Sequence, residues 1–315
     1  MAVEQSIRLN PTLRAEINLP CPAEGDAYRR LAHAWITAAT GLLAGPLGND
    51  FHQGLDLTAP ALANNGTGPC GPPGTLWASF VYYETTRRRQ RLVETYFSPA
   101  NWQEFLAQLG HRPLDAQLQL ALLDAEGQPG EPWLDVSLTR DHDAPDVVSL
   151  VAVRTSEEFE DPATADEAQQ RWESLLHSQV QSHGNVLYAY VADDSEHISG
   201  RTALEDGIGL LLGDTLPELE TTLRGYGWLT VCSPGVLAAL GGIAALRACE
   251  AFTEVTPVAG GGAWLKATDR IHGYTPAHVR AVFDALAPVL PPDKPVPTLA
   301  AETRRLVYEA PGRTR

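Results

Sequence analysis

Lysine is almost absent from this chain of 315 residues: its 23 basic residues include only two lysines, Lys266 and Lys294. Mechanisms that need a reactive lysine, such as Schiff-base formation or a P-loop phosphate clamp, therefore have almost no candidate residue. Cysteine is also scarce, and its four residues form no CxxC pair; they are Cys21, Cys70, Cys232 and Cys249. This spacing favours buried, reduced thiols over a disulfide framework.

Long hydrophobic runs are missing as well. No apolar run approaches the roughly 18–20 residues of a membrane-spanning helix, and the opening MAVEQSIRLNPTL lacks the basic and then apolar pattern of a secretion signal. The sequence therefore predicts no membrane partner. A cytoplasmic protein is the simplest interpretation.

Catalytic signatures are missing too. The chain has no GxSxG elbow, no HExxH helix and no EF-hand loop. Gly260-Gly261-Gly262 follows one expected strand and precedes another, which indicates a hairpin turn and offers no helix N-terminus to a phosphate. Gly241-Gly242 is expected to mark a break between two short helices or a close backbone contact. We predict no catalytic residue and no cofactor.

What is present is enough apolar sequence for a large core, 44% of the residues with seven tryptophans. Alternating and helical patterns predict strands within 7–19, 76–84, 90–97, 117–124, 133–140, 147–154, 186–193, 226–233, 252–258 and 263–269. Helices are expected near 27–44, 99–109, 169–181, 234–249 and 275–290. Strands outnumber crossover helices, so we expect an α+β fold with a largely antiparallel sheet and helices packed on one face. The order β-α-β-β-α near both ends allows two similar halves.

The expected organisation has three parts, which could also form one continuous domain. Residues 1–110 form an N-terminal α+β region with a long Gly/Pro-rich loop at 45–76, residues 111–292 an acidic meander plus a further α+β region, and 293–315 a C-terminal extension. Loops as long as 45–76 are uncommon in compact domains and are often functional.

Negative charge is concentrated in the middle third. Residues 101–200 carry 4 basic and 19 acidic side chains, a net charge of −15, whereas residues 1–100 and 201–315 have net charges of 0 and −1. A total of −16 opposes nucleic-acid binding, which depends on clustered cations. The one basic cluster, Arg87, Arg88, Arg89 and Arg91, fits a solvated hairpin bend better than a phosphate or RNA site.

Two interpretations of the acidic residues stay open: a solvated face that serves solubility, or a surface that contacts a basic protein partner. On the second interpretation, the candidate partner-binding residues are Glu157, Glu158, Glu160, Asp161, Asp166, Glu167, Asp193, Asp194 and Glu196.

Metal binding is the alternative for part of this set. Asp193, Asp194 and His197 follow a strand and could hold a divalent cation, which would make the chain a metal-dependent hydrolase. Asp141-His142-Asp143 could also supply ligands, although it fits a polar turn between strands better. We expect no bound metal.

One segment resembles a known family. Residues 201–290 contain a Tyr226-x-Trp228 strand, a helix with LGGxxAL at 240–246, a strand pair joined by Gly260–Gly262, and a closing helix before LxPVLPP at 286–292. In this segment the chain resembles the bacterial type VI immunity family, and the upstream helix with Trp172 and the strand ending at Asp193 fit loosely.

The resemblance implies an antidote-like protein that binds a cognate toxin without catalysing a reaction, and a basic toxin or effector as the partner. An accessory or scaffold protein of a biosynthetic or defence locus is the remaining alternative. The oligomeric state is left open.

Overall fold

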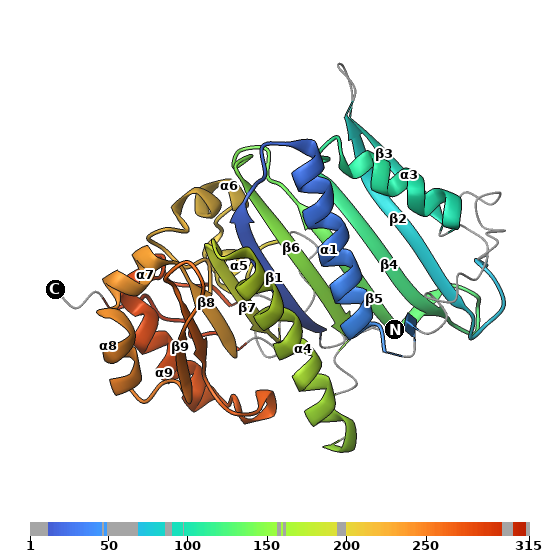
Figure 1. Ribbon diagram of the computed structural model, residues 1–315. Helices are drawn as coiled ribbons and strands as arrows, with labels where there is room; N and C mark the ends of the chain where they lie inside the picture. The colour runs from blue at the N-terminus through green and yellow to red at the C-terminus, as the bar shows by residue number, and fades with distance from the viewer. Residues whose placement is uncertain are drawn as a thin grey trace, which may run out of the picture.

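The computed structural model describes residues 12–45, 47–48, 69–85, 90–96, 98–155, 159, 162–193, 200–297 and 305–312. In this part of the chain, ten strands form one sheet in the order β3-β2-β4-β5-β6-β1-β7-β8-β10-β9, and every neighbouring pair is antiparallel (Figure 1). The expected α+β class with an antiparallel sheet is confirmed. The strands are β1 (Thr12–Pro20), β2 (Leu76–Thr85), β3 (Gln90–Tyr96), β4 (Asp115–Leu123), β5 (Pro129–Thr139), β6 (Val147–Thr155), β7 (Tyr188–Ala192), β8 (Leu229–Cys232), β9 (Glu254–Pro257) and β10 (Ala263–Lys266).

Strand β1 comes first along the chain but lies inside the sheet, between β6 and β7. It is buried on both faces, and its residues alternate between apolar side chains, such as Ala15 and Ile17, and polar ones, such as Glu16 and Asn18. Because successive strand residues point to opposite faces, β1 places an apolar row on one face of the sheet and a polar row on the other.

The apolar face is covered by α1 (Gly25–Leu43), α3 (Pro99–Leu109) and α4 (Pro162–His183), which cross the sheet in Figure 1. Phe80 of β2 stacks on Phe105 of α3, with ring centroids 4.7 Å apart. Trp35 of α1 and Trp172 of α4 are fully buried. Helix α3 begins at the predicted place because the Ser98 hydroxyl accepts a hydrogen bond from the Asn101 backbone N–H.

The remaining helical segments follow β7. They are α5 (Ala203–Ile208), α6 (Leu212–Thr215), α7 (Pro234–Ala239), α8 (Gly242–Ala248) and α9 (Pro276–Leu286), with short 3₁₀ turns η3 (Leu216–Glu218), η4 (Ile271–Gly273) and η5 (Ala287–Val289). Helix α5 has a capping box, in which Thr202 and Glu205 each bond the other's backbone N–H. Gly241, with φ +80°, separates α7 from α8 as predicted.

The segment 200–224 lies on the polar face of β1, where Arg224 reaches Glu16 and Asn18. The helices are therefore not confined to one face of the sheet. Segment 200–224 supplies polar partners for the buried polar groups of β1, which an apolar helix could not do.

The predicted glycine hairpin joins β9 and β10. A Cβ on Gly260 would lie 1.9 Å from the Gly184 carbonyl oxygen, and one on Gly262 would lie 2.1 Å from the Cys232 carbonyl oxygen. The backbones approach so closely that only glycine fits.

Two expectations differ in detail. The order β-α-β-β-α occurs near both ends, but the two halves pair differently. Strand β8 pairs directly with the β9–β10 hairpin, whereas β4, β5 and β6 lie between β1 and the β2–β3 hairpin. Cys249 is exposed rather than buried, because α8 ends at the surface, whereas Cys232 is buried in β8. Within the described residues all four cysteines are free.

None of the described helices has the combination of length and apolarity that crossing a bilayer requires.

Candidate binding site

Three of the predicted partner-binding residues fall within the described structure, and each pairs with an arginine of this chain. Asp166 lies 2.8 Å from Arg270, Glu167 lies 2.9 Å from Arg171 one helical turn away, and Asp193 lies 3.0 Å from Arg305. The other six lie outside the described residues: Glu157, Glu158, Glu160, Asp161, Asp194 and Glu196. An exposed pair such as Asp166–Arg270 stabilises a fold weakly, whereas the Asp193–Arg305 pair is partly buried.

The alternative metal site is described only in part. His197 and Asp194 lie outside the described residues, and Asp193 binds the Arg305 guanidinium. Within the described ranges, no three His, Cys, Asp or Glu side chains are grouped as metal ligands. At Asp141-His142-Asp143, the Asp141 carboxylate accepts the Asp143 backbone N–H at 2.8 Å, which confirms the polar turn.

A different site lies on the second face of the sheet, where β4 and β5 line a cavity of about 550 Å³. Its lining comes from alternate residues of the two strands: Asp115, Gln117 and Gln119 from β4, and Trp133, Asp135, Ser137 and Thr139 from β5. Val151 and Val153 of β6, Arg14 of β1 and Gly200 complete it. A cavity of this size with a few polar groups on a rigid sheet has the properties of a binding site.

Asp135 is the central carboxylate of this cavity. Its Oδ2 accepts hydrogen bonds from the Gln117 and Gln119 amides, the second at 3.4 Å. Burial raises the pKa of Asp135 to about 7, although the two amides and the more distant Arg14 oppose the rise and Asp115 adds to it. None of the ion pairs in the described part of the chain involves Asp135.

Asp115 lies at the far end of the same β4 row. Burial raises the pKa of Asp115 to about 6, against a backbone hydrogen bond that lowers it. Its Oδ1 is buried and accepts no hydrogen bond among the described residues. The cavity therefore holds two carboxylates that the described residues solvate poorly, and a cation would compensate for that loss.

A second hollow of about 290 Å³ shares Gln119, Trp133 and Asp135 with this cavity and is lined by two tryptophans. Trp77 of β2 and Trp133 of β5 both lie opposite Ala121 of β4, one on each side of it. Because cross-strand partners share a face, the two tryptophans lie on the same face of the sheet, on either side of Ala121. Tyr96 of β3 packs edge-on against Trp77, with ring centroids 6.1 Å apart.

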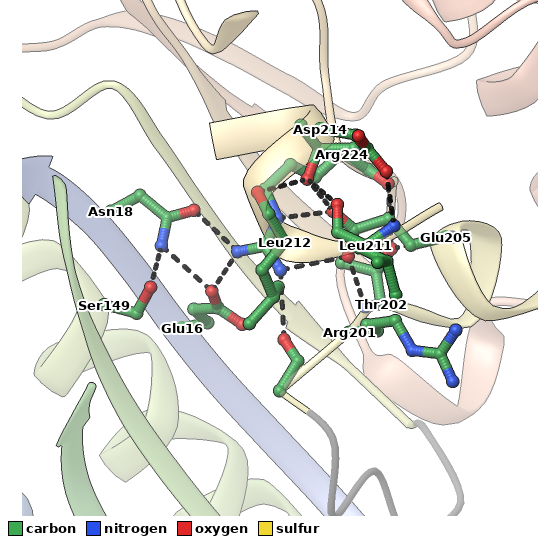
Figure 2. Close-up of polar contacts among 12 residues, drawn as sticks. Glu16, Asn18, Ser149, Arg201, Thr202, Glu205, Leu211, Leu212, Asp214 and Arg224 are labelled. Atoms are coloured by element: carbon green, nitrogen blue, oxygen red, sulfur yellow. Dashed lines mark hydrogen bonds and ion pairs between the residues drawn. The ribbon is translucent and has the colours of Figure 1, made fainter. Parts of the chain in front are cut away.

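Arg14 and Gly200, which line the cavity, belong to a buried ionic network. Figure 2 shows its part around Arg224, Glu16 and Glu205. Arg14 donates to the Glu16 carboxylate at 2.5 Å and to the Gly200 carbonyl at 2.9 Å. Arg224 bridges Glu16 and Glu205 and also donates to the Gly200 carbonyl, at 3.0 Å. Asn18 joins the network to β6 through the Ser149 hydroxyl at 2.7 Å.

The network keeps its charges although it is almost completely buried. Burial alone would raise the pKa of Glu16, but the Arg224 and Arg14 guanidiniums hold that pKa below its usual value. Burial likewise opposes the charge on Arg224, but Glu16 and Glu205 hold its pKa well above the usual range. Hydrogen bonds within this network position Gly200 and Arg14 where they line the cavity.

Sequence reasoning did not single out Asp115 or Asp135, although both lie in the acidic third. The signal that could have found them is the two-residue period of β4 and β5, in which Gln117, Gln119 and Asp135 share one face. A polar face of a strand normally indicates solvent, so the pattern could not reveal that this face encloses a cavity.

Comparisons with known proteins bear on the fold. No family model matches the chain, and no curated protein matches its sequence. Among solved structures, the Pseudomonas aeruginosa T6SS protein PA0821 is similar, with a TM-score of 0.51 and 15% identity, over 89% of this chain and 76% of that one. The two proteins share a fold.

Proposed function

We propose that this chain acts by binding, as an immunity-like protein of a type VI-associated system that neutralises a basic protein partner. The fold shared with PA0821, itself named a T6SS protein, and the resemblance of residues 201–290 to the type VI immunity family both favour this role. The observation that carries it is the cavity on β4 and β5, where Asp115 and Asp135 lack a cation among the described residues.

The charge distribution supports a basic partner. Both cavity carboxylates belong to residues 101–200, where the net charge is −15. A concentrated negative field accelerates the approach of a positive protein and selects against acidic ones. Because the flanking thirds are almost neutral, a basic partner should be attracted most strongly to the region of the meander β4-β5-β6. A cytoplasmic location and the predicted contacts at 157–167 and 193–196 are part of this proposal.

The test pairs this protein with the product of the coding region adjacent to its own. We expect a basic protein whose toxicity is relieved by co-expression. Its affinity for this chain should weaken steeply between about 50 and 500 mM salt, because added salt screens the charges. An adjacent product that does not bind at low salt, or that stays toxic on co-expression, would contradict the proposal.

Charge reversal provides a sharper version of this test. We expect the triple variant Glu157→Lys, Glu158→Lys and Glu160→Lys to slow association at least tenfold at low salt, because steering depends on the local field. Stopped-flow association measures it. The matched control reverses the exposed Glu218, Glu250 and Glu254, which changes the net charge equally but lies outside the acidic third. Equal effects of both triples would indicate a general charge effect and no acidic contact surface.

A further inference from the structure

The hollow lined by Trp77, Trp133 and Asp135, here termed the slot, has the chemistry to hold one particular kind of side chain. Neighbouring strands lie about 4.8 Å apart, so Trp77 and Trp133, two strands apart across Ala121, have their Cα atoms about 10 Å apart. A flat group between two rings needs about 3.5–4 Å on each side. The hollow that both tryptophans line, about 290 Å³, is therefore large enough to hold one planar group against their indoles.

Asp135 determines the charge of that planar group. It is two residues from Trp133 on the same face, and it lines both hollows together with Gln119. The two glutamine amides donate to its Oδ2, and Oδ1 accepts no hydrogen bond among the described residues. The flanking indoles attract a cation through their ring faces. An aromatic slot that ends at a carboxylate thus favours a flat cation.

We propose that the slot between Trp77 and Trp133 binds an arginine side chain of the partner, with its guanidinium stacked between the indoles and hydrogen-bonded to Asp135. This rests on the proposed function, since it assumes a basic protein partner. Arginine fits better than lysine because its guanidinium is planar, stacks on aromatic faces and presents a fork of N–H donors.

Proton release follows from this arrangement. The charged groups that face Asp135 are Asp115 of β4 and Arg14 of β1, and Arg14 is already paired with Glu16. Because the pKa of Asp135 is about 7, a bound guanidinium must displace a proton from part of the molecules at neutral pH. Arginine binding should therefore strengthen as the pH rises from 6 to 8 and release a proton.

The experiment uses N-acetyl-arginine amide as the probe and the full chain as the protein. We expect saturable shifts of two indole N–H signals in ¹H–¹⁵N spectra, assigned with Trp77→Phe and Trp133→Phe, and a dissociation constant in the millimolar range. The matching citrulline amide is planar but neutral and should bind at least tenfold more weakly. The lysine amide should bind several-fold more weakly.

Asp135→Asn keeps the shape of the side chain, and it should weaken the binding of the arginine probe at least fivefold and reduce the pH dependence of that binding. Asp293→Asn, at an exposed aspartate outside the cavity, is the control and should change neither. Equal binding of the arginine and citrulline probes, no saturable shift, or a response to a neutral saccharide in place of arginine would overturn the proposal.

The two proposals fail separately. If the arginine probe does not bind while the adjacent gene product does so in a salt-dependent manner, the slot assignment is wrong and the proposed function stands. If the probe binds at the slot but no basic protein is recognised, the proposed function is wrong and only the cation site remains.

Discussion

At the scale of single residues, this protein treats its buried charges in two different ways. Glu16 is completely buried but is surrounded by Arg14, Arg224 and Asn18, so it stays ionised. Asp135 faces a cavity with only amide donors beside it, so its pKa rises to about 7. The first arrangement stabilises a charge, and the second leaves one available for a ligand.

Replacing Asp135 should test this difference through stability. The folded state binds the proton of Asp135 more tightly than the unfolded chain does, so stability falls as the pH rises between 3.8 and about 7. We expect Asp135→Asn to raise the free energy of unfolding by about 1–2 kcal/mol at pH 8, discounted for partial exposure, and to change it little at about pH 4, close to the unfolded-state pKa of 3.8. Urea unfolding at both pH values measures this. A gain of equal size at both would show that the charge is not the cause.

Removing Arg224 should have the opposite effect. Arg224→Ala leaves Glu16 and Glu205 buried without their main partner, and we expect a loss of about 3–5 kcal/mol in the free energy of unfolding. The control is Arg280→Ala, which removes exposed pairs with Asp284 and Glu309 and should change stability little. Equal stability of the two variants in urea titrations would contradict the role of the network.

At the scale of elements, some glycines can be replaced by alanine, whereas others are required by the backbone around them. Gly41 lies on the exposed side of α1, and nothing lies within 4 Å of the Cβ that alanine would add. Gly260 has φ +87° and lies against the Gly184 backbone. The same substitution should therefore act in opposite directions at the two sites.

We expect Gly41→Ala to stabilise the protein by about 0.5–1 kcal/mol, because alanine has the higher helix propensity. Gly260→Ala should destabilise it by about 2 kcal/mol or more, since both the backbone conformation and the close contact oppose a Cβ. Thermal unfolding of the two variants compares them directly. A harmless Gly260→Ala would mean that the β9–β10 hairpin can move away from α4.

At the scale of the whole molecule, one sheet connects the meander β4-β5-β6 to residues 200–290. Strand β1 joins them by pairing with β6 on one side and β7 on the other. The Glu16–Arg224 network then fastens segment 200–224 to the same strand. We therefore interpret residues 200–290 as the support that positions the cavity, and the charge-reversal and co-expression experiments test that interpretation.

The sequence by itself determined the fold class, the meander and most element positions. Local signals were sufficient for these: the period of apolar residues, the Ser98 cap and the glycine hairpin at 260–262 act over a few neighbours. It also located the negative charge in residues 101–200, since charge is additive along the chain.

Only the tertiary structure decided where β1 lies, which charges are paired and which are not. The partners of Glu16 are as far away as Arg224, 208 residues along the chain, and the cavity combines alternate residues of β1, β4, β5 and β6. Asp166, Glu167 and Asp193 looked free in the sequence but have arginine partners, whereas Asp115 and Asp135 do not. Pairing and burial depend on long-range packing, which no local pattern of residues specifies.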